Sequence, residues 1–193
     1  MEKYKLYHAT ERKKALNIIK TKRFDIPKDT ENKEFLGEGA YYYDSRTNAI
    51  EWNSKSVKDT CKANFPSYKD MLDKYSIITS NIQIEENEIL DLDNRSDIIK
   101  YKIAVKIVKE RLQDIDNYND RNELGTIINY LYQNKKMKRK MIVKTIMYPI
   151  PNSYGVKLNK RVYCIKDKSI ILDFSMDKNI DWEEYRELEK LYS

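Results

Sequence analysis

Two short segments carry side chains whose types and spacing suit ligand binding. His8 is the only histidine in the chain and ends a short β-forming run, a position where functional side chains often face a cleft. Further along, Leu36-Gly37-Glu38-Gly39-Ala40-Tyr41 places two glycines just before an aromatic residue. The glycines allow the backbone to approach a ligand closely, and the aromatic ring can stack on a flat ring. Each segment also has a plain structural explanation: a hydrogen-bonded, half-buried histidine, and a β-turn before a tyrosine-rich edge strand.

The elements that must position these residues form an irregular mixture of strands and helices. Because no regular strand–helix–strand units of constant length appear, the order predicts an α+β fold. One long helix is expected over about 98–114, with Ile99, Ile103, Ile107 and Leu112 on one inward face. We expect strands at Lys5–His8, Phe35–Tyr43, Tyr75–Ile84, Glu88–Leu92, Met141–Met147, Val162–Lys166 and Ser169–Phe174, and further helices from a Thr10 cap to Lys22 and at Ser45–Cys61, Glu123–Gln133 and Trp182–Tyr192.

Length and composition limit the class of protein. A chain of 193 residues with 40% apolar content suits one domain with its own core. Cys61 and Cys164 show no metal-ligand spacing, so reduced thiols and no metal site are expected. The first residues lack the apolar core of a signal peptide, and no segment is apolar enough to span a membrane. We therefore expect a cytoplasmic protein.

The net charge of +6 is unevenly distributed. From Tyr132 to Lys168 there are eleven Lys/Arg against one acid, Asp167, so this stretch carries +10 and the rest of the chain −4. Such asymmetry is typical of a surface that faces nucleic acid or an acidic partner, although a solvated lysine-rich face explains it equally well. The candidates for contacts with nucleic-acid phosphates are Lys135, Lys136, Lys138, Arg139 and Lys140.

Together the two ligand-binding segments resemble a known family. Leu6-Tyr7-His8-Ala9-Thr10, a helix, a polar loop, Leu36-Gly37-Glu38-Gly39-Ala40-Tyr41 and then Ala49-Ile50-Glu51-Trp52 look like the NAD-binding half of the ADP-ribosyltransferase superfamily. The resemblance is to the branch with a His-Tyr-Glu signature, which includes poly-ADP-ribose polymerases and bacterial toxin-like relatives. It covers residues 4–54 and extends weakly to Ile89–Leu92 and Val162–Asp167.

The resemblance implies a single domain with a split mixed and antiparallel sheet and flanking helices. An NAD-binding half would span about 1–92, a helical insert about 96–133, and closing strands with a last helix about 141–193.

It also implies roles for individual residues. His8 would hydrogen-bond a ribose hydroxyl of NAD, the backbone of Ala9 would hold the nicotinamide amide with Thr10 beside it, and Tyr41 would stack on the nicotinamide. The implied cofactor-binding set is His8, Ala9, Thr10, Gly39, Tyr41 and Tyr43, with His8 and Tyr41 catalytic.

The third signature residue, usually Glu, falls at Val162 in our alignment, with Arg161 beside it. Neither side chain accepts a hydrogen bond as a carboxylate does. Either the register differs, or another acid such as Glu38 or Glu86 substitutes, or the protein is not a standard transferase. The missing Glu argues against polymer elongation.

The function predicted first is therefore NAD-dependent mono-ADP-ribosyl transfer, a glycosyl transfer, to a nucleic acid or protein. The resemblance suggests a toxin or phage-defence setting and an antitoxin or inhibitor as partner. The alternatives are a catalytically degenerate domain that binds NAD or docks a partner, an NAD glycohydrolase, or an RNA 2′-phosphotransferase. The last would need further active-site arginines, for which Arg12 and Arg23 are the nearby options.

Overall fold

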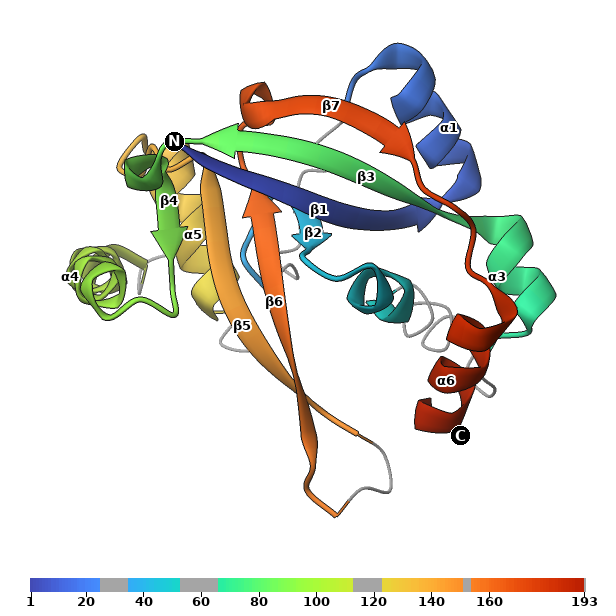
Figure 1. The fold of residues 1–193 in the computed structure, drawn as a ribbon. Helices are drawn as coiled ribbons and strands as arrows, with labels where there is room; N and C mark the ends of the chain where they lie inside the picture. The colour runs from blue at the N-terminus through green and yellow to red at the C-terminus, as the bar shows by residue number, and fades with distance from the viewer. Residues whose placement is uncertain (25–34, 53–65, 113–122, 151–153, 193) are drawn as a thin grey trace.

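A seven-stranded sheet with the strand order β4-β5-β6-β2-β1-β3-β7 forms the centre of the molecule (Figure 1). The computed structural model describes residues 1–24, 35–52, 66–112, 123–150 and 154–192. β4 pairs with β5 in parallel and the other neighbours are antiparallel, so the α+β class is confirmed.

The elements are, in chain order, β1 (Glu2–Glu11), α1 (Arg12–Thr21), β2 (Ala40–Tyr43), a helical stretch over 46–52, α3 (Tyr68–Lys74), β3 (Tyr75–Ile84), η1 (Glu86–Glu88), β4 (Ile89–Asp91), α4 (Arg95–Leu112), α5 (Glu123–Gln133), β5 (Met141–Pro149), β6 (Lys157–Ile165), η3 (Lys168–Ile170), β7 (Ile171–Met176) and α6 (Trp182–Tyr192).

The sheet is split between β1 and β2. These two strands are joined at one pair, Tyr7 opposite Tyr43. By contrast, β1 pairs with β3 along its whole length and β5 with β6 along theirs. In Figure 1, β1 and β3 run across the top of the molecule, whereas β5 and β6 descend steeply from them. The split leaves a gap between the second half of β1 and the first half of β2.

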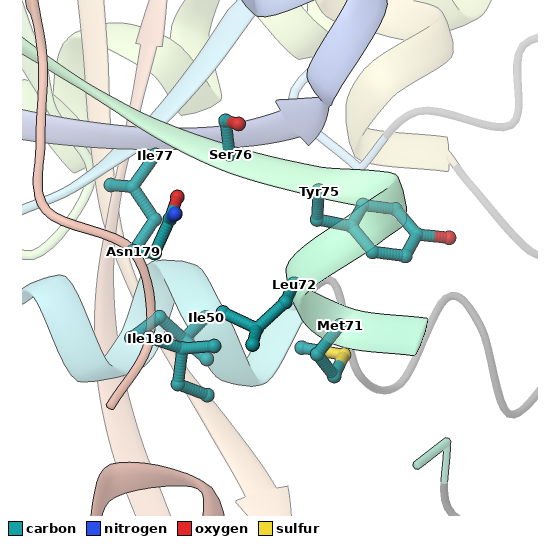
Figure 2. Close-up of a pocket in the computed structure, with 8 residues that line it drawn as sticks. All are labelled: Ile50, Met71, Leu72, Tyr75, Ser76, Ile77, Asn179 and Ile180. Carbon is teal, nitrogen blue, oxygen red and sulfur yellow. The ribbon is translucent and has the colours of Figure 1, made fainter. Parts of the chain in front are cut away.

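Different helices cover the two faces of the sheet. On one face, the 46–52 helix, α3, α5 and α6 pack onto a cluster that includes Val162 and Cys164 of β6. On the other, α1 packs through Ala15 and Ile18 against Leu6, Tyr42 and further residues. Packing on the first face is close: a void of about 10 Å³ lies between α3, the 46–52 helix and the segment before α6. Most of the side chains around it are apolar (Figure 2). That void is too small for an organic ligand.

Several predicted boundaries differ from the structure. β1 continues through Thr10 to Glu11, and α1 begins at Arg12. Thr10 therefore does not cap the helix, and Glu11, at the N-cap position, makes no side-chain capping bond. Pairing with β3, with Thr10 opposite Ser76, holds this segment in the extended conformation.

The inward face predicted for α4 is wrong at two positions. Ile99 and Ile103 are exposed, at 51% and 61%. The helix instead packs on α5 through a second stripe that includes Tyr101, Val105 and Val108. The side chains of Ile107 and Leu112 lie outside the described part of the chain, as do residues 113–114 of the predicted helix.

Cys164 is buried and makes no disulfide, whereas Cys61 lies outside the described residues. In the described part of the chain, no helix is long and apolar enough to cross a membrane.

Candidate functional site

A cleft of about 450 Å³ opens where β1 and β2 separate. We call it the His8 cleft. Its lining draws on both core clusters, since Tyr41 packs against the first and Ile18, Phe24 and Ala40 belong to the second. Its volume lies in the range of small-molecule and cofactor sites. The lining residues are His8, Thr10, Lys14, Asn17, Ile18, Phe24, Gly39, Ala40, Tyr41 and Trp52.

His8 spans the gap between the strands. Its Nδ1 lies 2.7 Å from the Tyr41 carbonyl oxygen, and its ring meets Phe24 edge-on at 4.9 Å between centroids. Burial lowers the pKa of His8 to about 4, against the smaller opposing effect of the Tyr41 carbonyl. The imidazole is therefore neutral near pH 7. Because a carbonyl oxygen only accepts, Nδ1 carries the proton and Nε2 is left as a hydrogen-bond acceptor.

The depressed pKa of His8 makes folding stability depend on pH. In the unfolded chain the imidazole titrates near 6.5, and in the folded chain near 4. Between these values the unfolded state binds a proton that the folded state does not, so acidification favours unfolding. We expect the contribution of His8 to the free energy of unfolding to be complete above pH 6.5 and to fall by about 2 to 3 kcal/mol by pH 4.5.

The comparison protein for this prediction is His8→Asn, whose amide can still donate to the Tyr41 carbonyl. Urea unfolding at pH 7 and pH 4.5 should show a larger loss in the wild-type protein than in the variant. Since His8 is the only histidine, an equal loss in both proteins would contradict the assignment. The nitrogen-15 chemical shifts of the His8 imidazole provide a second measurement, and we expect them to show the proton on Nδ1.

Tyr41 is held by the glycine turn that precedes it. Its hydroxyl donates to the Gly37 carbonyl at 2.8 Å and accepts from the Leu36 amide at 2.8 Å. Gly37 has a φ of +71°, a left-handed conformation that glycine adopts without strain. The Glu38 amide donates to Asn129 Oδ1 of α5 at 2.6 Å. The orientation of the Tyr41 ring is therefore fixed by hydrogen bonds within the protein.

Gly39 allows the same turn to lie directly on β6. A Cβ at this position would collide with Cys164 Sγ and come 3.0 Å from the Ile165 carbonyl oxygen. Lys166, directly after β6, also holds the turn, because its Nζ donates to the Leu36 carbonyl at 2.7 Å and to the Glu38 carbonyl. Contacts with α5, with β6 and with Lys166 thus fix the conformation of the turn.

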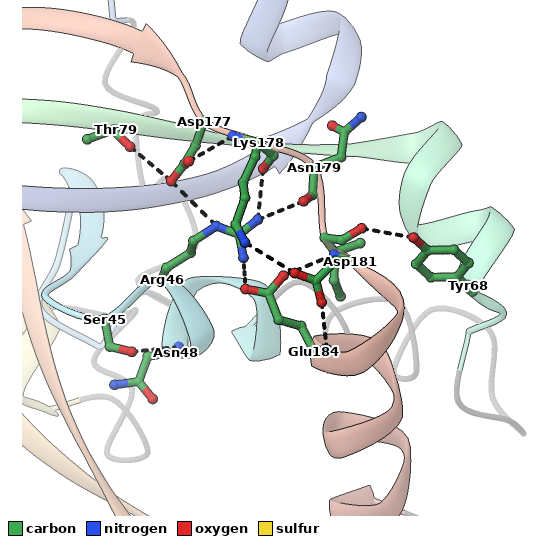
Figure 3. Close-up of polar contacts among 11 residues, drawn as sticks. Ser45, Arg46, Asn48, Tyr68, Thr79, Asp177, Lys178, Asn179, Asp181 and Glu184 are labelled. Atoms are coloured by element: carbon green, nitrogen blue, oxygen red, sulfur yellow. Dashed lines mark hydrogen bonds and ion pairs between the residues drawn. The ribbon is translucent and has the colours of Figure 1, made fainter.

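Trp52 reaches the cleft from the 46–52 helix, and its ring lies 6.4 Å from that of Tyr43. Arg46, at the start of this helix, anchors it to the chain before α6 (Figure 3). Its Nη2 donates to the carbonyls of Lys178 and Asn179 at 2.8 and 2.9 Å, and its guanidinium forms an ion pair with Glu184. The C-terminal segment thereby helps to place one wall of the cleft.

The structure brings together four of the six residues predicted to bind the cofactor: His8, Thr10, Gly39 and Tyr41 line the cleft. The other two are core residues. Ala9 lies on the opposite face of β1 from His8, because successive residues of a strand alternate between the two faces. Tyr43 shares the face of Tyr41 but is 3% exposed within the first core cluster.

Val162, the proposed third signature position, is also in the core. It pairs with Tyr43 across β2 and β6 and is 1% exposed. The alternative acids Glu38 and Glu86 do not line the cleft, and no carboxylate is among its lining residues in the described part of the chain. Arg12 and Arg23 are likewise absent from that lining, so the arginines that an RNA 2′-phosphotransferase would need are not brought to it.

The basic residues predicted to contact nucleic acid follow α5 and precede β5. Lys135, Lys136 and Lys138 are exposed, whereas Lys140 pairs with Glu88 at 2.7 Å. Arg139 lines a separate polar depression with Asp97. None of these five basic residues is among those that line the His8 cleft.

Sequence reasoning missed Lys14, Asn17, Ile18, Phe24, Ala40 and Trp52 as cleft residues. The α1 members could have been found, since positions 14, 17 and 18 share one face of the helix that directly follows β1. Phe24 and Trp52 depend on how distant segments pack, which the local sequence does not determine.

No family model matches the sequence. The chain is similar to an uncharacterized protein of Methanocaldococcus jannaschii, with 28% identity over 160 residues that cover 81% of this chain and 70% of that protein. That likeness gives no activity.

Proposed function

We propose that the chain is an NAD-dependent mono-ADP-ribosyltransferase that acts on a macromolecule. The observation that carries the proposal is the His8 cleft, in which a neutral histidine, a clamped tyrosine and a glycine turn meet at the split of the sheet. These residues come from the two segments that resemble the NAD-binding half of the ADP-ribosyltransferase superfamily.

The chemistry required is cleavage of the bond between nicotinamide nitrogen and ribose C1′. The bonding electrons leave with the ring, which becomes neutral nicotinamide, and positive charge develops on the ribose as in glycoside cleavage. An acceptor nucleophile then bonds to C1′ and loses its proton to solvent or a base. His8 Nε2 would orient a ribose hydroxyl, and Tyr41 would fix the departing ring, so that binding supports the transition state.

A second candidate function, NAD binding without catalysis, is favoured by one observation. Val162 is buried in the core, and no carboxylate lines the cleft among the described residues. The signature position that usually supplies the Glu therefore has no polar group, and the acid that normally stabilises the ribose cation would be missing.

The experiment that separates the two is incubation of the purified protein with labelled NAD, alone and with nucleic acid or cell lysate. Nicotinamide release and label transfer are measured together with NAD binding. We expect label on an acceptor and its loss in His8→Ala. Release without any acceptor would indicate a glycohydrolase, and binding with neither release nor transfer would establish the second candidate.

The nature of the acceptor is a separate part of the proposal. If it is nucleic acid, contacts by Lys135, Lys136 and Lys138 predict binding that weakens steeply with salt. The toxin or phage-defence setting, an inhibitor partner and a cytoplasmic location stay predictions from the sequence.

A further inference from the structure

The lining of the His8 cleft includes aromatic and cationic side chains. Tyr41 of β2 and Trp52 of the 46–52 helix are aromatic, whereas Lys14 and Asn17 belong to α1. Lys14 and Asn17 are three residues apart, so both lie on one face of the helix. With His8 neutral, Lys14 is the charged residue among those that line the cleft in the described part of the chain.

NAD carries groups that suit both kinds of side chain. Its nicotinamide ring is cationic and is attracted to aromatic faces, while its pyrophosphate is anionic and is bound in proteins by ammonium and amide donors. A ligand with its ring at Tyr41 and its ribose at His8 would extend toward α1.

We propose that Lys14, assisted by Asn17, binds the pyrophosphate of NAD and thereby selects the dinucleotide over nicotinamide compounds that lack phosphate. This inference rests on the proposed function, because it requires NAD in the His8 cleft. The Lys14 ammonium lies 3.0 Å from Glu11 Oε1 in an exposed i,i+3 pair. An exposed pair of this kind contributes little stability, so the pyrophosphate can displace it.

The test is calorimetric titration with two probes, NAD and nicotinamide riboside, against the wild-type protein and Lys14→Ala. We expect the variant to bind NAD about 10-fold more weakly, a difference that shrinks with added salt, while its affinity for nicotinamide riboside stays unchanged. Lys14→Arg should retain most of the NAD affinity. Lys14 is largely exposed, so the variants should fold normally.

The matched control is Lys13→Ala, which removes the same charge from the same turn of α1 at an exposed position outside the cleft lining. An equal loss in Lys13→Ala would overturn the inference in favour of a general charge effect, and so would unchanged NAD affinity in Lys14→Ala. Both outcomes leave NAD binding by the wild-type protein, and the proposed function, intact. If the wild-type protein binds neither probe, the proposed function itself fails.

Discussion

Replacing Lys160 with methionine should lower the free energy of unfolding by about 3 to 5 kcal/mol. Lys160 of β6 forms an ion pair with Glu51 of the 46–52 helix, and the two side chains are 5% and 3% exposed. The Lys160 ammonium also lies 4.9 Å from the centre of the Tyr148 ring. Methionine fills similar space but leaves the Glu51 carboxylate buried without its counter-charge, which is costly in a medium of low polarity. Urea unfolding monitored by circular dichroism measures the change.

The double variant Glu51→Gln/Lys160→Met separates the charge effect from a packing effect. With both charges removed, most of the lost stability should return, since no buried charge remains. Lys157→Met, at an exposed position on the same strand, should change stability by less than about 0.5 kcal/mol. A Lys160→Met protein as stable as the wild type would show that this pair is not buried in solution.

The buried pair also marks a limit of sequence reasoning. Glu51 and Lys160 lie 109 positions apart in the printed sequence, and each reads as an ordinary surface charge. Their pairing depends on β6 continuing past the end of β2, where the 46–52 helix covers it. The resemblance that includes Ala49-Ile50-Glu51-Trp52 predicted that this segment lies near the site, but it did not predict that Glu51 pairs with Lys160.

Apolar periodicity in the sequence predicted the bounds of several helices and strands correctly. The bounds of β3, α5 and α6 agree with the prediction, because each has a clear apolar period and a sharp end. The face of α4 was predicted wrongly, because that helix has two apolar stripes and packing on α5 chooses Val105 and Val108 over Ile99 and Ile103. Periodicity shows that stripes exist, but it does not show which one meets a partner.

The candidate site likewise contains residues that local sequence identifies and residues that it does not. His8, Gly39 and Tyr41 were recognisable from local features: a lone histidine in a β-forming run, a close backbone approach and a ring after a turn. The position of Val162, by contrast, depends on contacts between distant segments. Its strand was predicted, but its burial against Tyr43 follows from how β6 pairs with β2 across the sheet.

Substituting the two central residues of the His8 cleft should abolish NAD cleavage. We expect nicotinamide release to fall on the order of 100-fold or more in Tyr41→Ala and in His8→Asn. The first variant removes the ring that would fix the nicotinamide. The second keeps the hydrogen bond to the Tyr41 carbonyl but removes the acceptor at Nε2, so its fold should be retained while activity is lost.

Tyr41→Phe is the control that separates the ring from the hydroxyl. It keeps the aromatic face but loses the bonds to the Gly37 carbonyl and the Leu36 amide, so we expect about 1 kcal/mol less stability with most of the activity retained. If Tyr41→Phe were as inactive as Tyr41→Ala, the hydroxyl and not the ring would be the important group. Should the wild-type protein bind NAD without cleaving it, the same variants are compared by NAD affinity, in which Tyr41→Ala should be weakest and Tyr41→Phe near the wild type. Full activity or affinity in Tyr41→Ala would place the ligand elsewhere, because this variant lacks the ring that is expected to hold the nicotinamide and that the glycine turn holds in place.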